Sequence, residues 1–150
     1  MDILPFEPKF VQACLAIFDS NMPDFFHPGE RPGLESFLAA PHHPFWVLVN
    51  EGAVLACGGF DHEPGAVFAR IHWGMVHKDW HGKGLGRLLL LYRLREIGRI
   101  PGVNSAQVGT TPQSAPFFEK QGFRVTSIEK DGWGAGFDRV EMVKKLAVCP

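Results

Sequence analysis

The sequence predicts an α/β (α+β) fold in which a mixed, mostly antiparallel sheet of about six or seven strands is flanked by about four helices. Three observations predict it. Apolar segments separated by tight turns follow one another over residues 45–77, which is typical of an antiparallel meander. A glycine-rich turn then leads into a long leucine-rich helix. A further strand, helix and pair of strands complete the chain.

The N-terminal third is predicted to form a short edge strand and two helices. Residues 2–6 form the strand, which Pro5 confines to a sheet edge. A proline opens an amphipathic helix at about residues 9–19, and a second short helix covers about residues 34–39. Between them, Phe25 and Phe26 lie in a loop rich in proline and glycine, where they either wall a pocket or fill the core.

The rest of the chain supplies six further strands and two helices. The leucine-rich helix ends at Gly98. The last helix is predicted to begin at Pro112, with Thr111 as its cap, and to be closed by Gly122. A glycine-rich turn is expected at residues 131–136. The predicted strands cover residues 45–50, 53–61, 66–77, 104–110, 123–129 and 139–146.

Length and composition predict one domain over residues 1–150. A hydrophobic content of 45% in 150 residues suits one compact core and is too little for two domains. The formal net charge of -1 argues against a nucleic-acid partner, although four arginines cluster in or beside the long helix. They are Arg87, Arg93, Arg95 and Arg99.

Cysteine usage and hydropathy predict a cytoplasmic protein without a membrane partner. Cys14, Cys57 and Cys149 are an odd number of widely spaced cysteines, which favours a reducing compartment. No apolar segment approaches the ~20 residues that span a bilayer, and no basic run precedes an apolar stretch at the N-terminus.

Residues 71–98 combine a strand, a glycine-rich turn and the long helix, and this order predicts an anion site. Glycines in the turn let the backbone approach a ligand closely, and the first amides of the helix have no partner inside it. With the helix dipole and the side chains of Lys83 and Arg87, these amides would hold a phosphate or pyrophosphate. The alternative is an ordinary connection between a strand and a helix.

The glycine spacing excludes two common nucleotide-binding loops. No third glycine stands where the Rossmann fingerprint needs it, and Gly84 follows Lys83 where a Walker A loop requires Ser or Thr. The segment His81-Gly-Lys-Gly84-Leu-Gly86 instead resembles the pyrophosphate-binding motif A of the GNAT N-acetyltransferases. That motif is usually Arg or Gln, two residues, Gly, one residue, and Gly or Ala, so His81 replaces the usual first residue.

A second segment strengthens the resemblance. Residues 117–123, Phe-Phe-Glu-Lys-Gln-Gly-Phe, are similar to motif B of the same family, usually an apolar residue followed by Tyr-Glu-Lys-x-Gly-Phe. The two motifs come in the family order, each after a predicted strand. The resemblance is strong over residues 66–123 and weak before residue 45. It implies the GNAT fold, whose central strands splay apart, and acetyl-CoA (coenzyme A) as cosubstrate without a metal.

The resemblance also implies which residues hold the cosubstrate. Free backbone groups of the strand before the loop, where Gly74 marks a bulge, would meet the acetyl group and the pantetheine arm. The loop and the start of the motif B helix would complete the site. The implied cofactor-binding residues are Met75, Val76, His81, Gly82, Lys83, Gly84, Leu85, Gly86, Arg87, Thr111, Ser114 and Phe118.

In this family an amine attacks the thioester directly, so a base must take a proton from the ammonium group. Arg70 and His72 fall at strand positions that the family uses for the base. Arg70 stays protonated, whereas His72 titrates near neutrality and is the candidate general base, acting directly or through a water. The alternative is that His72 is a half-buried strand residue bonded to backbone. Glu63, in a turn, is a weaker candidate.

The family's acid is the tyrosine of motif B, and Phe118 replaces it here. The only tyrosine, Tyr92, lies within the long helix. Water or a hydroxyl such as that of Ser114 must then protonate the departing thiolate. Alternatively the thiolate leaves unaided, since its pKa is near about 8.5, as for a free cysteine. Ser114 is therefore the second candidate catalytic residue.

These inferences predict an N-acetyltransferase that transfers the acetyl group of acetyl-CoA to a primary amine, on a small molecule or a peptide, in a ternary complex. The replaced tyrosine leaves open a non-catalytic module that binds or senses coenzyme A or acyl-CoA. A nucleic-acid module built on the arginine-rich helix would require steeply salt-dependent binding to DNA or RNA. Edge strands at the C-terminal end of such a sheet can pair between subunits, which is compatible with a homodimer.

Overall fold

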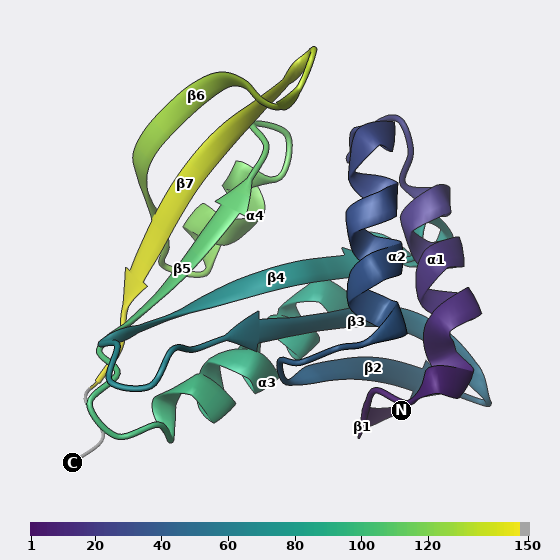
Figure 1. The fold of residues 1–150 in the computed structure, drawn as a ribbon, viewed down its shortest axis with the longest axis horizontal. Coiled ribbons are helices and arrows are strands. Elements are labelled where there is room, and N and C mark those ends of the chain that lie inside the picture. The colour runs from purple at the N-terminus through teal and green to yellow at the C-terminus, as the bar shows by residue number, and fades with distance from the viewer. Residues whose placement is uncertain (148–150) are drawn as a thin grey trace.

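The computed structural model describes residues 1–147 and shows one seven-stranded sheet with helices on both faces (Figure 1). The strands are β1 (Asp2–Pro5), β2 (Phe45–Asn50), β3 (Ala53–Asp61), β4 (Phe68–Val76), β5 (Ser105–Thr110), β6 (Arg124–Gly134) and β7 (Phe137–Lys145). The α-helices are α1 (Val11–Ser20), α2 (Arg31–Ala39), α3 (Leu85–Gly98) and α4 (Ala115–Lys120), with 3-10 turns at Pro8–Phe10, Pro28–Glu30 and Lys78–Trp80. Within the described residues, none of the helices is both long and apolar enough to cross a membrane.

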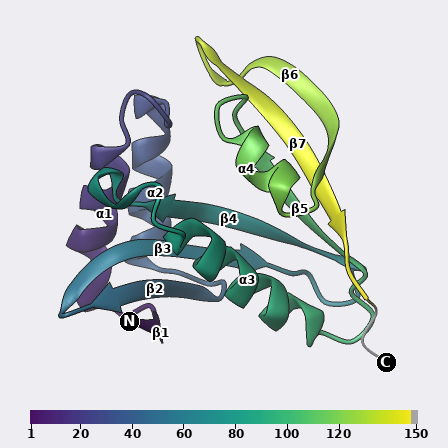
Figure 2. The same ribbon diagram turned by 180° about the vertical axis from the view of Figure 1, so that it is seen from behind.

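Over residues 1–147 the strand order is β1-β2-β3-β4-β5-β7-β6, and there only β4 and β5 are parallel neighbours. This confirms the predicted mixed, mostly antiparallel sheet. The parallel pair requires a crossover, which α3 supplies. Helices α1 and α2 cover one face of the sheet, whereas α3 and α4 lie on the other, as the two opposite views show (Figures 1 and 2).

Strands β4 and β5 pair only at their beginnings. The register runs from Phe68 opposite Ser105 to Arg70 opposite Gln107, and beyond this point the strands diverge. Strands β5, β7 and β6 therefore lean away from the rest of the sheet (Figure 1). This confirms the splayed central strands, and it leaves backbone groups on the facing edges of β4 and β5 without a strand partner.

A bulge lies in β4 just beyond the splay. The pairing of β4 with β3 shifts by one residue between Cys57 and Gly59, so Trp73 and Gly74 together oppose Gly58. Trp73 has a φ of 50°, a left-handed conformation that is rare for a residue with a bulky side chain. The predicted bulge at Gly74 is thus confirmed, and the alternation of side chains along β4 changes there.

The core lies on both faces of the sheet. On the α1 and α2 face, Phe18, Leu34 and Cys57 are fully buried, so Cys57 is a core residue. On the α3 face, Leu90 and Ile97 are fully buried against β4, β5 and β7. The predicted compact core follows from these faces, because each helix covers apolar side chains of the sheet. Cys149 lies outside the described residues.

Several predicted boundaries are wrong. Helix α2 begins at Arg31, not at about residue 34, because the 3-10 turn at Pro28–Glu30 leads directly into it. Helix α4 begins at Ala115, because the Thr111 carbonyl, and not its hydroxyl, accepts the bonds from Ser114 N and Ala115 N at 3.1 and 2.9 Å. Strand β6 continues through most of the expected glycine-rich turn to Gly134. The carboxylate of Asp131 accepts a hydrogen bond from Gly136 N at 2.8 Å, which helps hold the longer hairpin.

Candidate functional site

The loop between β4 and α3 presents open backbone amides at the start of a 14-residue helix. Gly82 and Gly84 have φ of 74° and 81°, and a Cβ on either would meet no other atom within 4 Å. The first helical bond joins Leu88 N to Gly84 O at 3.0 Å. The amides that precede it, those of Leu85, Gly86 and Arg87, therefore have no partner inside the helix. This arrangement fits an anion that approaches from solvent.

Contacts with the end of β4 hold the loop in place. The Val76 carbonyl accepts hydrogen bonds from Asn21 Nδ2 and from His81 Nε2, both at 2.9 Å. A Cβ on Gly86 would lie 3.6 Å from the Val76 side chain and 3.5 Å from the Phe117 ring of α4. The loop, the end of β4 and helix α4 therefore meet at one place, as the two predicted motifs imply.

The side chains around the loop have two roles: some carry positive charge, and others hold the loop in place. Lys83 and Arg87 are exposed and free to turn toward a bound phosphate. The ring of Phe25 stands edge-on to His81 with centroids 5.1 Å apart, so it supports the loop. Phe26 packs in the core instead. His81, the residue that departs from the family pattern, thus acts in this structure as an anchor between β4 and the aromatic loop.

The start of α4 carries polar groups with no protein partner. The hydroxyl of Thr111 is buried and makes no hydrogen bond with any described residue. Ser114 is the N-cap residue of α4, and its side chain makes no capping bond. An orphaned buried hydroxyl is costly unless a ligand satisfies it, and the amides of a pantetheine arm offer both donors and acceptors. The residues present therefore fit coenzyme A, with pyrophosphate at the loop and the arm along α4.

Two of the predicted cofactor-binding residues, Met75 and Phe118, have side chains that pack against the core. Met75 is 4% exposed and packs on the α1 and α2 face, so only its backbone can reach the carrier. Phe118 packs against the core, with its ring edge-on to Phe117 and to Phe123. Phe118 thus occupies the position of the family's tyrosine, and its side chain supplies no hydroxyl there.

His72 lies on the α1 and α2 face of β4, on the opposite side of the sheet from Ser114 and α4. Its ring meets those of Phe37, His43 and Phe45 at centroid distances of 5.2, 5.7 and 6.3 Å. Both ring nitrogens are buried without a hydrogen-bond partner among the described residues. Burial lowers the pKa of His72 to about 4, against a smaller opposing effect of Asp61, so the imidazole is neutral at physiological pH.

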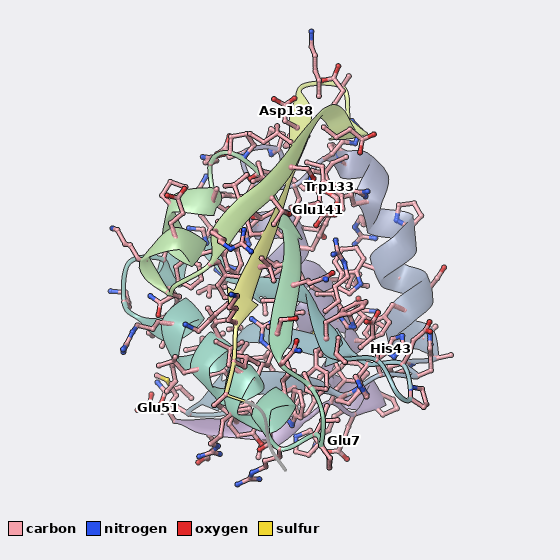
Figure 3. The ribbon with its side chains drawn as sticks, turned by 90° about the vertical axis from the view of Figure 1, so that its left-hand side faces the viewer. Glu7, His43, Glu51, Trp133, Asp138 and Glu141 are labelled. Atoms are coloured by element: carbon pink, nitrogen blue, oxygen red, sulfur yellow. The ribbon has the colours of Figure 1, made fainter. Side chains whose placement is uncertain are left out.

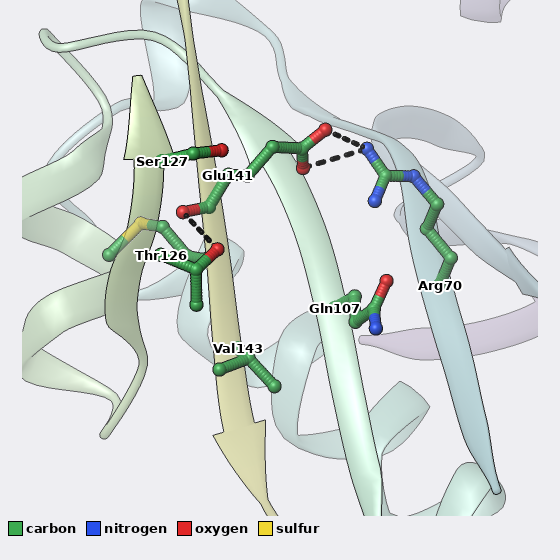
Figure 4. A pocket seen from close by; sticks show the side chains of 7 residues that line it. Arg70, Gln107, Thr126, Ser127, Glu141 and Val143 are labelled. Carbon is green, nitrogen blue, oxygen red and sulfur yellow. Dashed lines mark hydrogen bonds and ion pairs between the residues drawn. The ribbon is translucent and has the colours of Figure 1, made fainter.

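An ion pair spans the splay on the same face. The guanidinium of Arg70 on β4 crosses over Gly109 of β5 and donates to both carboxylate oxygens of Glu141 on β7, at 2.8 and 2.9 Å (Figure 4). It borders a groove of about 340 Å³ that Gln107 and Thr126 also line. Arg70 stands at a family position for the base but acts here as a bridge between the two halves of the sheet.

The walls above this bridge come from the C-terminal hairpin. Trp133 donates its indole N–H to the Thr110 carbonyl at 2.9 Å, and the guanidinium of Arg139 lies 4.3 Å from a Trp133 ring centroid. Figure 3 shows Trp133 and Glu141 along these strands, with His43 below them. The ring of His27, which precedes α2, stands edge-on to Phe137 at 5.3 Å. Aromatic rings from both halves of the sheet therefore line the face that carries His72.

Sequence reasoning missed Asn21, Phe117, Glu141 and Arg93. The first three act across 55, 31 and 71 positions of sequence (Asn21 to Val76, Gly86 to Phe117, Arg70 to Glu141), and no local pattern signals such contacts. Arg93 carried a signal, because an arginine within a leucine-rich helix face is unusual. It is 4% exposed and belongs to no predicted site.

Comparisons with known proteins agree with this geometry. The sequence profile of the family described as "Acetyltransferase (GNAT) domain" matches residues 41–125, more than half of the chain. The protein belongs to the GNAT acetyltransferase family. No curated protein sequence matches the chain significantly.

Solved structures with the same fold cover almost the whole chain. A proposed GNAT-family acetyltransferase from Desulfovibrio desulfuricans has a TM-score of 0.80 at 20% identity, covering 97% of this chain and 99% of that one. The ribosomal-protein-S18-alanine N-acetyltransferase from Escherichia coli has 0.80 at 16%, covering 99% and 96%. An aminoglycoside 6'-N-acetyltransferase complexed with coenzyme A has 0.79 at 15%, covering 100% and 99%. These likenesses show the GNAT fold.

Proposed function

We propose that this protein is an N-acetyltransferase that transfers the acetyl group of acetyl-CoA to a primary amine by direct attack in a ternary complex. The open helix start at Gly84, set beside the orphaned hydroxyl of Thr111 and the splay of β4 from β5, is the observation that carries the proposal. A neighbour of the same fold is complexed with coenzyme A, which supports the choice of carrier. The carrier supplies an activated acetyl thioester.

In this proposal, residues on one face of the sheet bind the carrier, and residues on the other face transfer the proton. The amides of Leu85 and Gly86 hold pyrophosphate, while Thr111 and Ser114 bond the pantetheine arm. On the other face, His72 takes the ammonium proton. Because its nitrogens are buried, the proton reaches solvent through His43, whose Nε2 lies 3.9 Å from an Asp61 carboxylate oxygen. A neutral histidine in an apolar setting can accept a proton only transiently, so this relay matters.

The acceptor belongs to the class of primary amines. Neighbours of the same fold include N-acetyltransferases for aminoglycosides and for a ribosomal protein, which supports an amine acceptor but does not choose among small molecules and peptides. We therefore test polyamines, aminoglycosides, amino acids and peptides with a free N-terminus side by side.

The test is amine-dependent release of free thiol from acetyl-CoA, with acetyl-CoA binding followed in parallel by calorimetry. We expect binding, and thiol release with at least one amine class above the rate without amine. Absence of binding would overturn the whole proposal. The ring of Phe118, partly buried and without a hydroxyl, favours a second candidate, a module that binds or senses coenzyme A without turnover. Tight binding with no release from any amine would support that candidate.

A further inference from the structure

Arg93 is a buried cation in the middle of α3. It is 4% exposed, and within residues 1–147 no carboxylate lies close enough to form an ion pair with it. Its two hydrogen bonds are long: Nε donates to the Leu89 carbonyl at 3.4 Å and Nη1 to the Gly59 carbonyl at 3.3 Å. Burying a charge with so little compensation is unfavourable, which favours the binding of an anion beside Arg93 that residues 1–147 do not supply.

The sheet is shaped to receive this guanidinium. A Cβ on Gly58 would lie 2.9 Å from Arg93 Cζ, and a Cβ on Gly74 would lie 2.8 Å from Nη2. Both strands therefore carry a glycine where the guanidinium lies against them. Gly74 belongs to the β4 bulge, beyond the last pair of β4 with β5, and it is exposed. Nη2, which donates to no described residue, therefore stands beside the opening between the two strands.

The place is within reach of the carrier. Arg93 lies about two turns along α3 from the loop amides, or about 10 Å at 1.5 Å per residue. An extended pantetheine arm is longer than this, so a thioester held through the loop can lie at the bulge. This step rests on the function proposed above.

We propose that Arg93 is a further catalytic residue, whose Nη2 stabilises the negative charge on the coenzyme A sulfur as the acetyl group leaves. In that step the amine nitrogen forms a bond to the acetyl carbon and the C–S bond breaks. The electron pair of the broken bond stays on sulfur. His72 takes one proton from the ammonium group before the attack, and the second proton that nitrogen loses as the amide forms passes to solvent water. A fixed cation in a desolvated site favours the thiolate without giving it a proton, which offsets the absent tyrosine at Phe118.

The titratable groups near Arg93 leave its guanidinium positively charged. Burial lowers the pKa of Arg93 to about 10, so it remains protonated at neutral pH. Its charge also helps lower the pKa of His72, a smaller effect than burial. Cys57 is the other titratable group near Arg93. A hydrogen bond with Cys14 and burial raise its pKa well above the usual range, so it stays a thiol.

The test is the pKa of the bound coenzyme A thiol, read from the ultraviolet difference absorbance of the thiolate as pH is varied. We expect this pKa to be at least about one unit lower on the wild-type protein than on Arg93→Met, a tenfold difference in the thiolate-to-thiol ratio. Arg93→Lys should restore part of the difference. Gly74→Ala, which pushes the guanidinium away while Arg93 remains, should resemble Arg93→Met. The matched control is Arg95→Met on the exposed side of α3, which should match the wild type.

Steady-state kinetics of the same variants provide a second test. Arg93→Met should lower kcat by about 10- to 100-fold with little change in KM for acetyl-CoA, since the charge develops only as the thiolate forms. Circular dichroism establishes that each variant is folded. If coenzyme A binds to the wild type and to Arg93→Met with the same thiol pKa, the role of Arg93 is overturned while the proposed function stands. If the wild type does not bind coenzyme A at all, both are overturned.

Discussion

The two faces of β4 differ in what they bring to the splay. On the α3 face, glycine backbone, free amides and the cation of Arg93 lie together, and none of them changes charge near neutral pH. On the α1 and α2 face, His72 lies among aromatic rings with both nitrogens unpartnered, and its pKa is lowered to about 4. The α3 face therefore offers amides and a cation to negative charge, whereas the other face surrounds a neutral proton acceptor with aromatic rings and carries the Arg70–Glu141 pair farther along the splay.

The bulge at Trp73 and Gly74 separates these two environments. Without the extra residue, side chains would alternate regularly between the two faces along the whole of β4. The bulge shifts this alternation by one residue. Under the proposed function, the difference places carrier binding and proton transfer on opposite faces, so single substitutions should alter one without the other.

The largest expected effect is on turnover. His72→Ala should lower kcat for acetyl transfer by about 10²- to 10⁴-fold, because it removes the proposed proton acceptor, with unchanged affinity for coenzyme A. The wild-type rate should show no acid limb near pH 6.5, since His72 stays neutral down to about pH 4. His62→Ala, which changes a histidine bonded to Ala66 O in the turn before β4, serves as control. Equal kcat in both variants would remove His72 from the mechanism.

The next effect is on carrier affinity. Gly84→Ala should weaken coenzyme A binding by about 10- to 100-fold, because its Cβ intrudes on the open amides and their charge-assisted bonds are lost. Gly52→Ala is the matched control, since Gly52 has nearly the same φ, 80°, and equally open surroundings in the β2–β3 turn. Both should lose about 1 to 2 kcal/mol of stability, but only Gly84→Ala should lose affinity by calorimetry. A parallel loss at Gly52 would mean that strain alone explains the effect.

A third effect concerns the stability of the His72 face. The unfolded chain protonates His72 near pH 6.5 and the folded chain near pH 4, so stability should be full above pH 6.5 and fall as pH drops toward 4. At pH 5 the loss should be about 2 kcal/mol relative to pH 7.5, measured by urea unfolding. His72→Phe should unfold with a shallower pH dependence. An unchanged dependence would show that His72 is not desolvated.

The smallest effect concerns the bridge across the splay. Glu141→Gln should cost about 0.5 to 1 kcal/mol, because Arg70 is left with a neutral partner at a site where both side chains are about 30% exposed. The matched control is Glu35→Gln, which changes the more exposed pair with Arg31 and should cost less, because Arg31 keeps its bonds to Asp19. If urea unfolding gave the same small loss for both, Arg70 and Glu141 would be an ordinary surface pair.

Much of the fold could be predicted because most of its elements depend on residues that are neighbours in the sequence. The strands at residues 45–50 and 53–61 match β2 and β3, since a tight turn at Glu51 and Gly52 fixes the hairpin. The loop before α3 was visible because its glycines adopt the positive φ that only glycine accepts cheaply. The strand boundary at residue 129 was wrong, because side-chain bonds of Asp131 and Asp138 extend the hairpin through residues that usually end a strand.

The sequence by itself determined the order of elements, the glycine loop and the two family motifs, because each depends on neighbours within a few residues. Only the tertiary structure decided that Arg93 lies against two glycines of the sheet, that His72 is enclosed by Phe37 and Phe45, and that Arg70 is bound by Glu141. The physical reason is that burial and charge pairing arise from residues far apart in the chain, and these set what an ionisable group can do.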